Sequence, residues 1–452
     1  MCKKAFRIFL FVFLGILLFS YSSADEGMWL LESIGQLPTD SLKALGLKLN
    51  PAEIYTAGGG GISDAIAKVN GSSGSFVSPR GLIVTNHHVA FSAIQRLSTV
   101  EHNYLRDGFY AEAKEQELPT ISYYVDVPKH FKDVTSRFHS VLNDRMSDLK
   151  RQQAVEEISK KIIREAEQNK DIKAEVISAF GGCRYYLVTY FRIRDIRLVY
   201  APPRSVGDYG GEIDNWMWPR HAGDFTFFRA YVSPGGKAAE YSKDNVPYDS
   251  KTFLKLSSAG IKEGDFVMLI GFPRKTSRYE CSYSIDQVIN HDYPLDIRTR
   301  QDLIAILEKA SSMDSSVAIR LSSRINGLYN YLKKHQGELE GFRKSDILLK
   351  KTEEERTLEK FINDDPGRKK KFGRILAELD SLYQENKKLQ DKDFVMSWMT
   401  SECSFLNFAS TIYKWSLEKK KDDEKGSQVI RIGIPWRPES GWWIPRLIWF
   451  LQ

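Results

Sequence analysis

Two adjacent histidines, His87 and His88, are the first residues in the chain whose type and position suggest catalysis. They follow two short β-type runs, 76–77 and 82–85, which are joined by Pro-Arg-Gly at 79–81, a sequence typical of a tight turn. The pattern predicts a hairpin that holds an imidazole at the end of a buried strand. A rigid strand end suits a general base, because the ring must be held while its proton moves. The alternative is that the two histidines only close a core strand.

A carboxylate that could orient such a base, Asp224, stands directly before another β-type run, 225–232. It ends a loop rich in glycine and polar residues, 207–223. A carboxylate that accepts the Nδ1 proton of an imidazole fixes the tautomer and stabilises the imidazolium. One of the histidines and Asp224 are therefore predicted to be two members of a nucleophile–base–carboxylate set.

The composition is that of a globular protein of two or three domains, since 452 residues with 42% hydrophobic and 27% charged residues can form a sizeable core. The net charge of +7 is small for this length, and basic residues are interspersed with acidic ones. No RNA-binding aromatic pattern accompanies them, so nucleic acid is not an expected partner. The wide spacing of Cys183, Cys281 and Cys403 indicates neither a disulfide framework nor a CxxC metal site.

Residues 1–24 have the pattern of a secretory signal peptide. Basic residues precede an apolar run, 8–19, and the small residues 22–24 follow it. The apolar run is too short to span a membrane comfortably. We expect a mature protein that starts near Asp25, is periplasmic or secreted, and has no membrane contact after the signal is cleaved.

The periodicity of apolar residues changes near residue 276. Before it, β-type runs predominate around one helical stretch at 134–170. After it, apolar residues recur at helical spacing between charges. We therefore expect a β-rich region at 25–276 and an α-helical domain at 277–425. The β-type runs that follow the helical stretch are 185–190, 196–200, 225–232 and 265–273.

Residues 426–452 do not continue this pattern. They contain four of the nine tryptophans and three prolines, without periodicity. Such a sequence is more typical of a shifted reading frame than of an evolved terminus, and we expect a truncated product.

Two motifs, 85–88 (Thr-Asn-His-His) and 215–225 (Asn-Trp-Met-Trp-Pro-Arg-His-Ala-Gly-Asp-Phe), resemble the bacterial S46 peptidases, the dipeptidyl-peptidase 7 and 11 group. The resemblance extends from about Asp25 to about Lys425. It implies a fold that is mainly β plus α, a chymotrypsin-like double β-barrel with a large inserted α-helical domain, whose second barrel is incomplete here. It also implies a serine-type hydrolase that releases N-terminal dipeptides from peptides with a free N-terminus, without cofactor or metal. A homodimer is left open.

The resemblance assigns roles to five residues. His88 would be the general base and Asp224 its orienting carboxylate. Asn215, Trp216 and Asn330 would hold the free α-amine of the substrate, because an amide oxygen can accept from the ammonium and an indole can bound it by cation–π contact. The alternative for these three residues is ordinary packing or loop hydrogen bonding.

The chain departs from the family pattern in two ways. Val89 stands where members commonly have a cysteine after the base, and the Gly-Asn-Ser-Gly-Ser-Pro type motif of the nucleophilic serine would lie beyond residue 452. The oxyanion hole and the specificity pocket would lie there too. A similar run at 71–75 precedes the base, so neither Ser73 nor Ser75 is expected to be the nucleophile. We therefore expect this 452-residue chain to be inactive alone.

Two other classes of function are left open by the sequence. A non-catalytic periplasmic binding or interaction protein could use the helical region on a degenerate peptidase scaffold. A metal hydrolase with His87, His88 and Asp224 as ligands ranks third, since adjacent side chains on a strand point to opposite faces. If His88 is the base, as the resemblance implies, His87 and His221 are expected to be structural.

Overall fold

The computed structural model describes residues 29–143, 145–167, 169–273 and 280–419. These residues form two compact units. The described part of the smaller unit comprises 29–61 and Lys262–Phe266, and the larger unit comprises the other described residues. The predicted signal peptide at 1–24 and the tail at 426–452 lie outside the described residues.

The described part of the smaller unit contains short helices. They are η1 (Leu31–Gln36), α2 (Thr39–Ala44) and α3 (Pro51–Ile54). Helix α3 begins with a proline, whose fixed φ suits the first helical turn. The backbone N–H of Asn50 donates to the Glu53 carboxylate at 2.8 Å, which satisfies a donor at the start of this helix.

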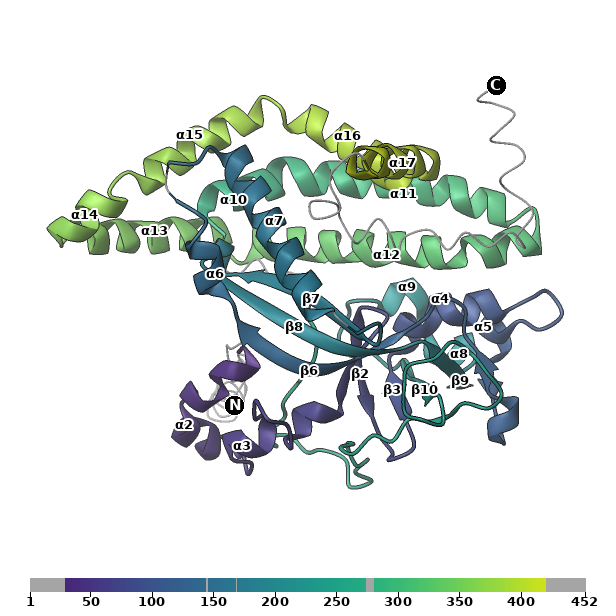
Figure 1. The fold of residues 1–452 in the computed structure, drawn as a ribbon. Coiled ribbons are helices and arrows are strands. Elements are labelled where there is room, and N and C mark those ends of the chain that lie inside the picture. The colour runs from purple at the N-terminus through teal and green to yellow at the C-terminus, as the bar shows by residue number, and fades with distance from the viewer. Residues whose placement is uncertain (1–28, 144, 168, 274–279, 420–452) are drawn as a thin grey trace, which may run out of the picture. The chain divides into compact units, whose positions relative to one another are not determined.

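An antiparallel sheet of eleven strands is the frame of the larger unit (Figure 1). The strands are β1 (Ile66–Val69), β2 (Ser72–Phe76), β3 (Leu82–Thr85), β4 (Phe109–Tyr110), β5 (Leu118–Pro119), β6 (Val125–Asp133), β7 (Ile172–Ala179), β8 (Arg184–Ile193), β9 (Asp195–Ala201), β10 (Thr226–Val232) and β11 (Val246–Pro247). Their spatial order is β4-β9-β10-β3-β2-β1-β6-β8-β7, with β5 against β9 and β11 against β10. Strands β3 and β10 are therefore neighbours although they are far apart in the sequence.

The hairpin predicted from the sequence is confirmed as β2 and β3, in which Phe76 pairs with Ile83. The turn between them contains Gly81, whose φ is 64°. A Cβ at this position would lie 2.7 Å from the carbonyl oxygen of Ala230. Glycine is the residue that tolerates both this conformation and this close approach.

The core of the larger unit lies between the sheet and α4 (His87–Leu97). Ile83 of β3 and Phe228 of β10 are fully buried together with Ile94 of the helix. Because successive strand residues point to opposite faces, this burial fixes the register of both strands.

A second core packs α6 (Thr135–His139) and α7 (Asp148–Ala166) on β7 and β8. Phe138 is fully buried, and its ring stacks on Tyr185 with centroids 3.8 Å apart and an interplanar angle of 5°. Ile162 of α7 is buried beside them. The helical stretch predicted at 134–170 is confirmed, with a break between the two helices, and the runs at 185–190, 196–200 and 225–232 correspond to β8, β9 and β10.

Helices occupy most described residues from 282 to 419, as the helical spacing predicted. The buried side chains Ile304, Leu328 and Leu332 join α11 to α12. The boundary at residue 276 stays a prediction. The helices of this part are α10 (Ser282–Gln287), the π-helix η5 (Val288–Asp292), α11 (Tyr293–Ser311), α12 (Ser315–Lys344), α13 (Ile347–Asn363), α14 (Pro366–Phe372), α15 (Ile375–Lys387), α16 (Gln390–Glu402) and α17 (Ser404–Lys419).

Short helices also occur between the strands of the larger unit. They are η2 (Ile62–Ala65), α5 (Tyr104–Asp107), η3 (Lys114–Gln116), η4 (Phe180–Gly182), α8 (Arg204–Gly207) and α9 (Gly211–Asp214). Of the helices described, none combines the length and the apolar character that crossing a membrane requires.

The strand predicted at 265–273 is wrong, because these residues form no strand. Among the described residues no strand pairs with them. The N–H of Phe272 instead donates to the hydroxyl of Ser73 at 2.7 Å. A strand forms only where a neighbour supplies hydrogen bonds to its backbone, and an apolar run does not show whether such a neighbour exists.

Replacing Phe138 by alanine tests the second core. We expect Phe138→Ala to lower the free energy of unfolding by about 3–5 kcal/mol, because the substitution leaves a cavity against Tyr185. Leu149→Ala is the matched control on α7, since Leu149 is 65% exposed, and it should change stability by less than about 0.5 kcal/mol. Urea unfolding followed by circular dichroism measures both, and equal effects would contradict this packing.

Candidate active site

The two histidines lie in the first turn of helix α4, and not at the end of a strand as the sequence predicted. Strand β3 ends at Thr85, and Asn86, with extended backbone angles, is the N-cap residue of the helix. Asparagine is one of the favoured residues at this position. The turn from strand to helix is thus immediate, and it holds His87 and His88 on a rigid element.

The pairing of β3 with β10 brings Asp224 to this helix. Thr85 is opposite Thr226 in the antiparallel register. Residues that follow β3 and residues that precede β10 therefore lie at the same edge of the sheet. Asp224, two residues before β10 begins, reaches the start of α4 in this way.

The Asp224 carboxylate contacts His88 through both oxygens. Oδ2 lies 2.7 Å from His88 Nδ1, and Oδ1 accepts the His88 backbone N–H at 3.0 Å. The Asn86 side chain donates to Oδ2 at 3.2 Å. The side chain of His88 is 59% exposed, whereas that of Asp224 is 18% exposed. An anion at a helix N-terminus is stabilised by unpaired N–H groups and the helix dipole.

This geometry fixes the tautomer of a neutral His88 ring. Because a carboxylate only accepts hydrogen bonds, Nδ1 must carry the proton and Nε2 is left as the basic nitrogen. Burial alone would raise the pKa of Asp224. The hydrogen bonds and charge of His88 outweigh burial and hold the pKa of this carboxyl below its usual range. Asp224 is therefore suited to remain ionised beside the ring.

His87 points into the core and has a different environment. It is 1% exposed, its Nδ1 lies 3.3 Å from the Thr226 hydroxyl, and its ring meets Phe91 edge-on. A Cβ at Gly207 would lie 2.8 Å from this ring, so only glycine leaves room for it. Burial lowers the pKa of His87 and keeps its ring neutral.

The two imidazoles therefore do not converge on one point, as a pair of metal ligands would. Within the described ranges, His, Cys, Asp and Glu side chains form no group of three or more that could hold a metal ion. The cysteines Cys183, Cys281 and Cys403 are free thiols in the structure.

The three residues assigned to amine binding lie together. Asn330, on α12, accepts a hydrogen bond from the Trp216 indole N–H through its side-chain oxygen at 3.1 Å and through its backbone oxygen at 3.0 Å. The Asn215 amide donates to the same side-chain oxygen at 3.4 Å. Asn215 and Trp216 follow directly after α9. The structure thus joins residues that are more than a hundred positions apart in the sequence.

Trp216 is held in an unusual conformation. Its φ is 60°, in the left-handed region that a bulky residue rarely adopts. Such conformations cost about 1–3 kcal/mol and cluster at functional sites. Trp216 is 57% exposed, so burial does little to offset this cost. Its indole N–H is directed at Asn330.

Helix α4 and helix α12 are connected directly. The side chain of Gln95, on α4, donates to the backbone oxygens of Ile319 and Arg320 on α12, each at 2.8 Å. The helix that carries His88 and the helix that carries Asn330 are therefore tied to each other.

No described serine is a partner of His88. The ring of His88 is hydrogen-bonded to Asp224 alone among the residues that the structure describes. Ser73 lies on β2, and its hydroxyl accepts the Phe272 N–H. This placement agrees with the expectation that Ser73 is not a nucleophile.

Two residues of this site were not predicted from the sequence. Asn86 bonds to Asp224, and the position of an asparagine just before a helix could have revealed it. Arg220 donates to the Asn215 side-chain oxygen at 3.2 Å, and only its place inside the 215–225 motif hinted at this. His221, expected to be structural, is exposed in the loop before β10.

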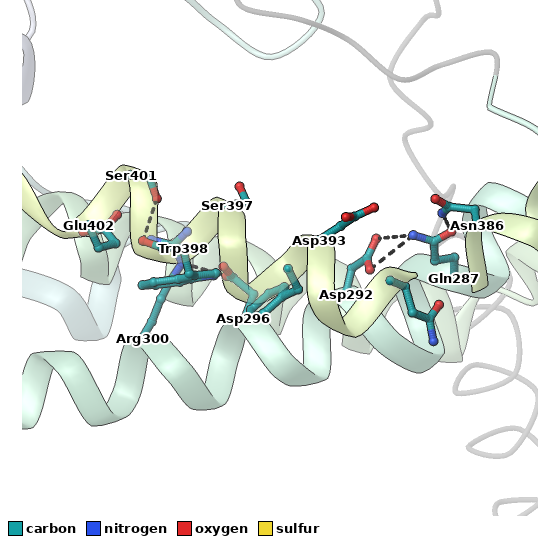
Figure 2. A pocket seen from close by; sticks show the side chains of 12 residues that line it. Gln287, Asp292, Asp296, Arg300, Asn386, Asp393, Ser397, Trp398, Ser401 and Glu402 are labelled. Carbon is teal, nitrogen blue, oxygen red and sulfur yellow. Dashed lines mark hydrogen bonds and ion pairs between the residues drawn. The ribbon is translucent and has the colours of Figure 1, made fainter. Parts of the chain in front are cut away.

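A cavity of about 410 Å³ lies elsewhere, between the helices of the 282–419 part (Figure 2). Asp296 and Arg300 of α11 form one wall, and Trp398 of α16 lies over Arg300, whose guanidinium carbon is 4.9 Å from the ring centroid. None of the residues that line it belongs to the His88 or Asn330 groups.

Comparisons with known proteins agree with these motifs. The model of the family Peptidase S46 matches residues 24–432. Dipeptidyl-peptidase 7 of Capnocytophaga gingivalis is 36% identical over 371 residues, which are 82% of this chain and 52% of that protein. The Asp/Glu-specific dipeptidyl-peptidase of Flavobacterium psychrophilum is 34% identical over 379 residues, 83% of this chain and 53% of that protein. The chain spans about half the length of the curated relatives it matches.

A solved structure shows the same fold. The crystal structure of Porphyromonas endodontalis DPP11 in complex with the dipeptide Arg-Glu superposes with a TM-score of 0.74 at 31% identity, covering 81% of this chain and 53% of that chain. This likeness, with the large antiparallel sheet and the many helices, confirms the expected combination of β and α structure. The double β-barrel stays a prediction. The family match and these relatives show that the chain belongs to the peptidase S46 family.

Proposed function

We propose that this protein is a serine-type dipeptidyl-peptidase, exported from the cytoplasm, that acts on the free N-terminus of peptides. The observation that carries the proposal is the 2.7 Å contact between His88 Nδ1 and the Asp224 carboxylate on an exposed ring. The similarity to a dipeptidyl-peptidase 7 and to an Asp/Glu-specific dipeptidyl-peptidase supports the reaction class. The signal-like residues 1–24 support export.

In this proposal His88 acts as base and then as acid. Its Nε2 takes the proton of a serine hydroxyl while the serine oxygen attacks the peptide carbonyl, and it returns that proton to the leaving amine. Water then attacks the acyl-enzyme with the same assistance. Asp224 holds the Nδ1–H and stabilises the imidazolium in both steps. We assign the nucleophile to none of the described residues.

The Asn215–Trp216–Asn330 group would make the enzyme an exopeptidase. Amide oxygens accept hydrogen bonds from an α-ammonium group, and the face of an exposed indole attracts a cation. The strained backbone of Trp216 supports a role beyond packing. An N-acetylated peptide has no ammonium group and would lose these interactions.

The binding of short peptides tests this recognition. We expect a tripeptide amide with a free amine to bind the 452-residue chain roughly tenfold or more tightly than its N-acetylated form, since hydrogen bonds to a charged group are involved. Asn330→Ala should remove most of that difference, because it removes the oxygen that Trp216 and Asn215 share. NMR titration measures both affinities.

The control for this titration is Asn386→Ala, an asparagine on α15 whose side chain bonds to Gln287. It should keep the preference for the free amine. Equal binding of the free and acetylated peptides by the unchanged protein would contradict the proposed exopeptidase site and would favour a general binding protein.

Peptide hydrolysis by the 452-residue chain tests whether a described residue can serve as the nucleophile. We expect no release of dipeptides from dipeptidyl fluorogenic amides, because His88 is hydrogen-bonded to no hydroxyl group among the described residues. The measurement is the fluorescence rate of the purified chain beside its His88→Ala variant. A rate that the variant abolishes would show that a nucleophile of this chain does reach His88.

The pH dependence of stability tests the Asp224 contact. The folded-state pKa of Asp224 lies below its unfolded value, so its contribution is present above about pH 4 and is lost as the pH falls through the folded pKa. We expect Asp224→Asn to lower the free energy of unfolding at pH 7 by roughly 1–3 kcal/mol. The difference from the unchanged protein should shrink below pH 4.

Urea unfolding at a series of pH values provides this measurement. Asp244→Asn, at an exposed aspartate in the loop before β11, is the matched control and should have little effect at any pH. A cost of Asp224→Asn that is the same at pH 7 and at pH 3 would mean that the carboxylate charge does not stabilise the fold.

A further inference from the structure

A dense group of basic residues lies on the last turn of α13, on α14 and directly before α15. Basic and acidic residues are interspersed over most of the chain, but 360–374 contains six basic residues against two acidic ones. Figure 1 shows α14 at a free end of the helical elements. We call this surface the basic tip; it consists of Lys360, Arg368, Lys369, Lys370, Lys371 and Arg374.

The lysines of the basic tip are not neutralised by the protein. Lys369, Lys370 and Lys371 are exposed, and within the described residues none of them forms an ion pair. Of the two acidic residues, Asp365 is already engaged, because its carboxylate accepts the Arg368 backbone N–H at 2.7 Å and caps α14. Arg374 forms an ion pair with Glu378 at 3.4 Å, so the unpaired positive charge of the basic tip is that of Lys369, Lys370 and Lys371.

Apolar side chains are exposed among these charges. Phe361, Phe372 and Ile375 are 54%, 39% and 42% exposed. The Arg368 guanidinium lies 3.8 Å from the centre of the Phe361 ring, and Lys371 Nζ lies 4.9 Å from that of Phe372. The side chain of Ile362 is buried, so α13 is anchored while its neighbours in the sequence face outward.

We propose that the basic tip docks on an anionic lipid surface. Binding of a soluble polyanion would need only the lysines. Docking on a bilayer also buries aromatic and aliphatic side chains in the headgroup region next to the charges. The expectation that the mature protein avoids membranes rested on the lack of a spanning run, and peripheral docking needs none. No residue of the basic tip belongs to the proposed active site, so this inference does not depend on the peptidase proposal.

Vesicle co-sedimentation of the 452-residue chain tests the docking. We expect binding to vesicles of phosphatidylglycerol and phosphatidylethanolamine, and none to vesicles of phosphatidylcholine. The variant Lys369→Gln/Lys370→Gln/Lys371→Gln should bind roughly 100-fold more weakly, because each basic residue near an anionic surface contributes about a fivefold factor.

The matched control removes the same charge from the same part of the protein. Lys387, Lys388 and Lys392 are exposed on or beside α15 and α16, away from the basic tip. The variant Lys387→Gln/Lys388→Gln/Lys392→Gln should keep most of the vesicle binding. Circular dichroism confirms that both triple variants are folded. An equal loss in both would show a general charge effect and would overturn the proposal.

A double variant tests the apolar contribution. Phe361→Ser/Phe372→Ser keeps every charge of the basic tip but removes both exposed rings. We expect it to lose the binding that persists in about 0.5 M salt, where interactions between exposed charges are screened. Two results together would overturn docking on lipid and identify a site for polyanions in general. The unchanged protein would lose its vesicle binding in high salt, and it would bind heparin as tightly as it binds the vesicles.

Discussion

The antiparallel pairing of β3 with β10 is the constraint on which the site depends. It sets Thr85 opposite Thr226, so that the first turn of α4 and the residues before β10 meet at one edge of the sheet. The Asp224 carboxylate there accepts both the backbone N–H and the ring Nδ1–H of His88. One side chain thus caps a helix and fixes an imidazole. Strand register, helix start and ring orientation are consequences of the same pairing.

A second constraint holds α12, which carries Asn330. Gln95 ties this helix to α4. On α12 itself, His335 lies 2.7 Å through its Nδ1 from Oδ2 of Asp296 on α11, and Arg300 donates to the same oxygen at 2.7 Å. Burial would raise the pKa of Asp296, but these two partners lower it below its usual range. The helix is therefore held at residues before and after Asn330 in the sequence.

The sequence predicted which residues would meet, but not how the backbone presents them. The 215–225 motif and its resemblance to a family singled out Asp224 and Trp216 as candidate site residues, because a motif of that length is specific. The strand end predicted for His88 is a helix start, since an apolar β-type run does not show where a helix begins; Asn86, a favoured N-cap residue, was the available signal. The prediction of a strand at 265–273 was wrong because an apolar run does not show whether a neighbouring strand will pair with it.

The tautomer of His88 is the most direct test of the central claim, that Asp224 orients this ring as a base. Two-dimensional ¹⁵N–¹H NMR of the histidine rings, compared between the unchanged protein and Asp224→Asn, distinguishes the two tautomers. We expect that neutral His88 carries its proton on Nδ1, with a strongly deshielded proton signal that the variant loses. A proton on Nε2 in the unchanged protein would contradict it, because the carboxylate would then face an unprotonated nitrogen.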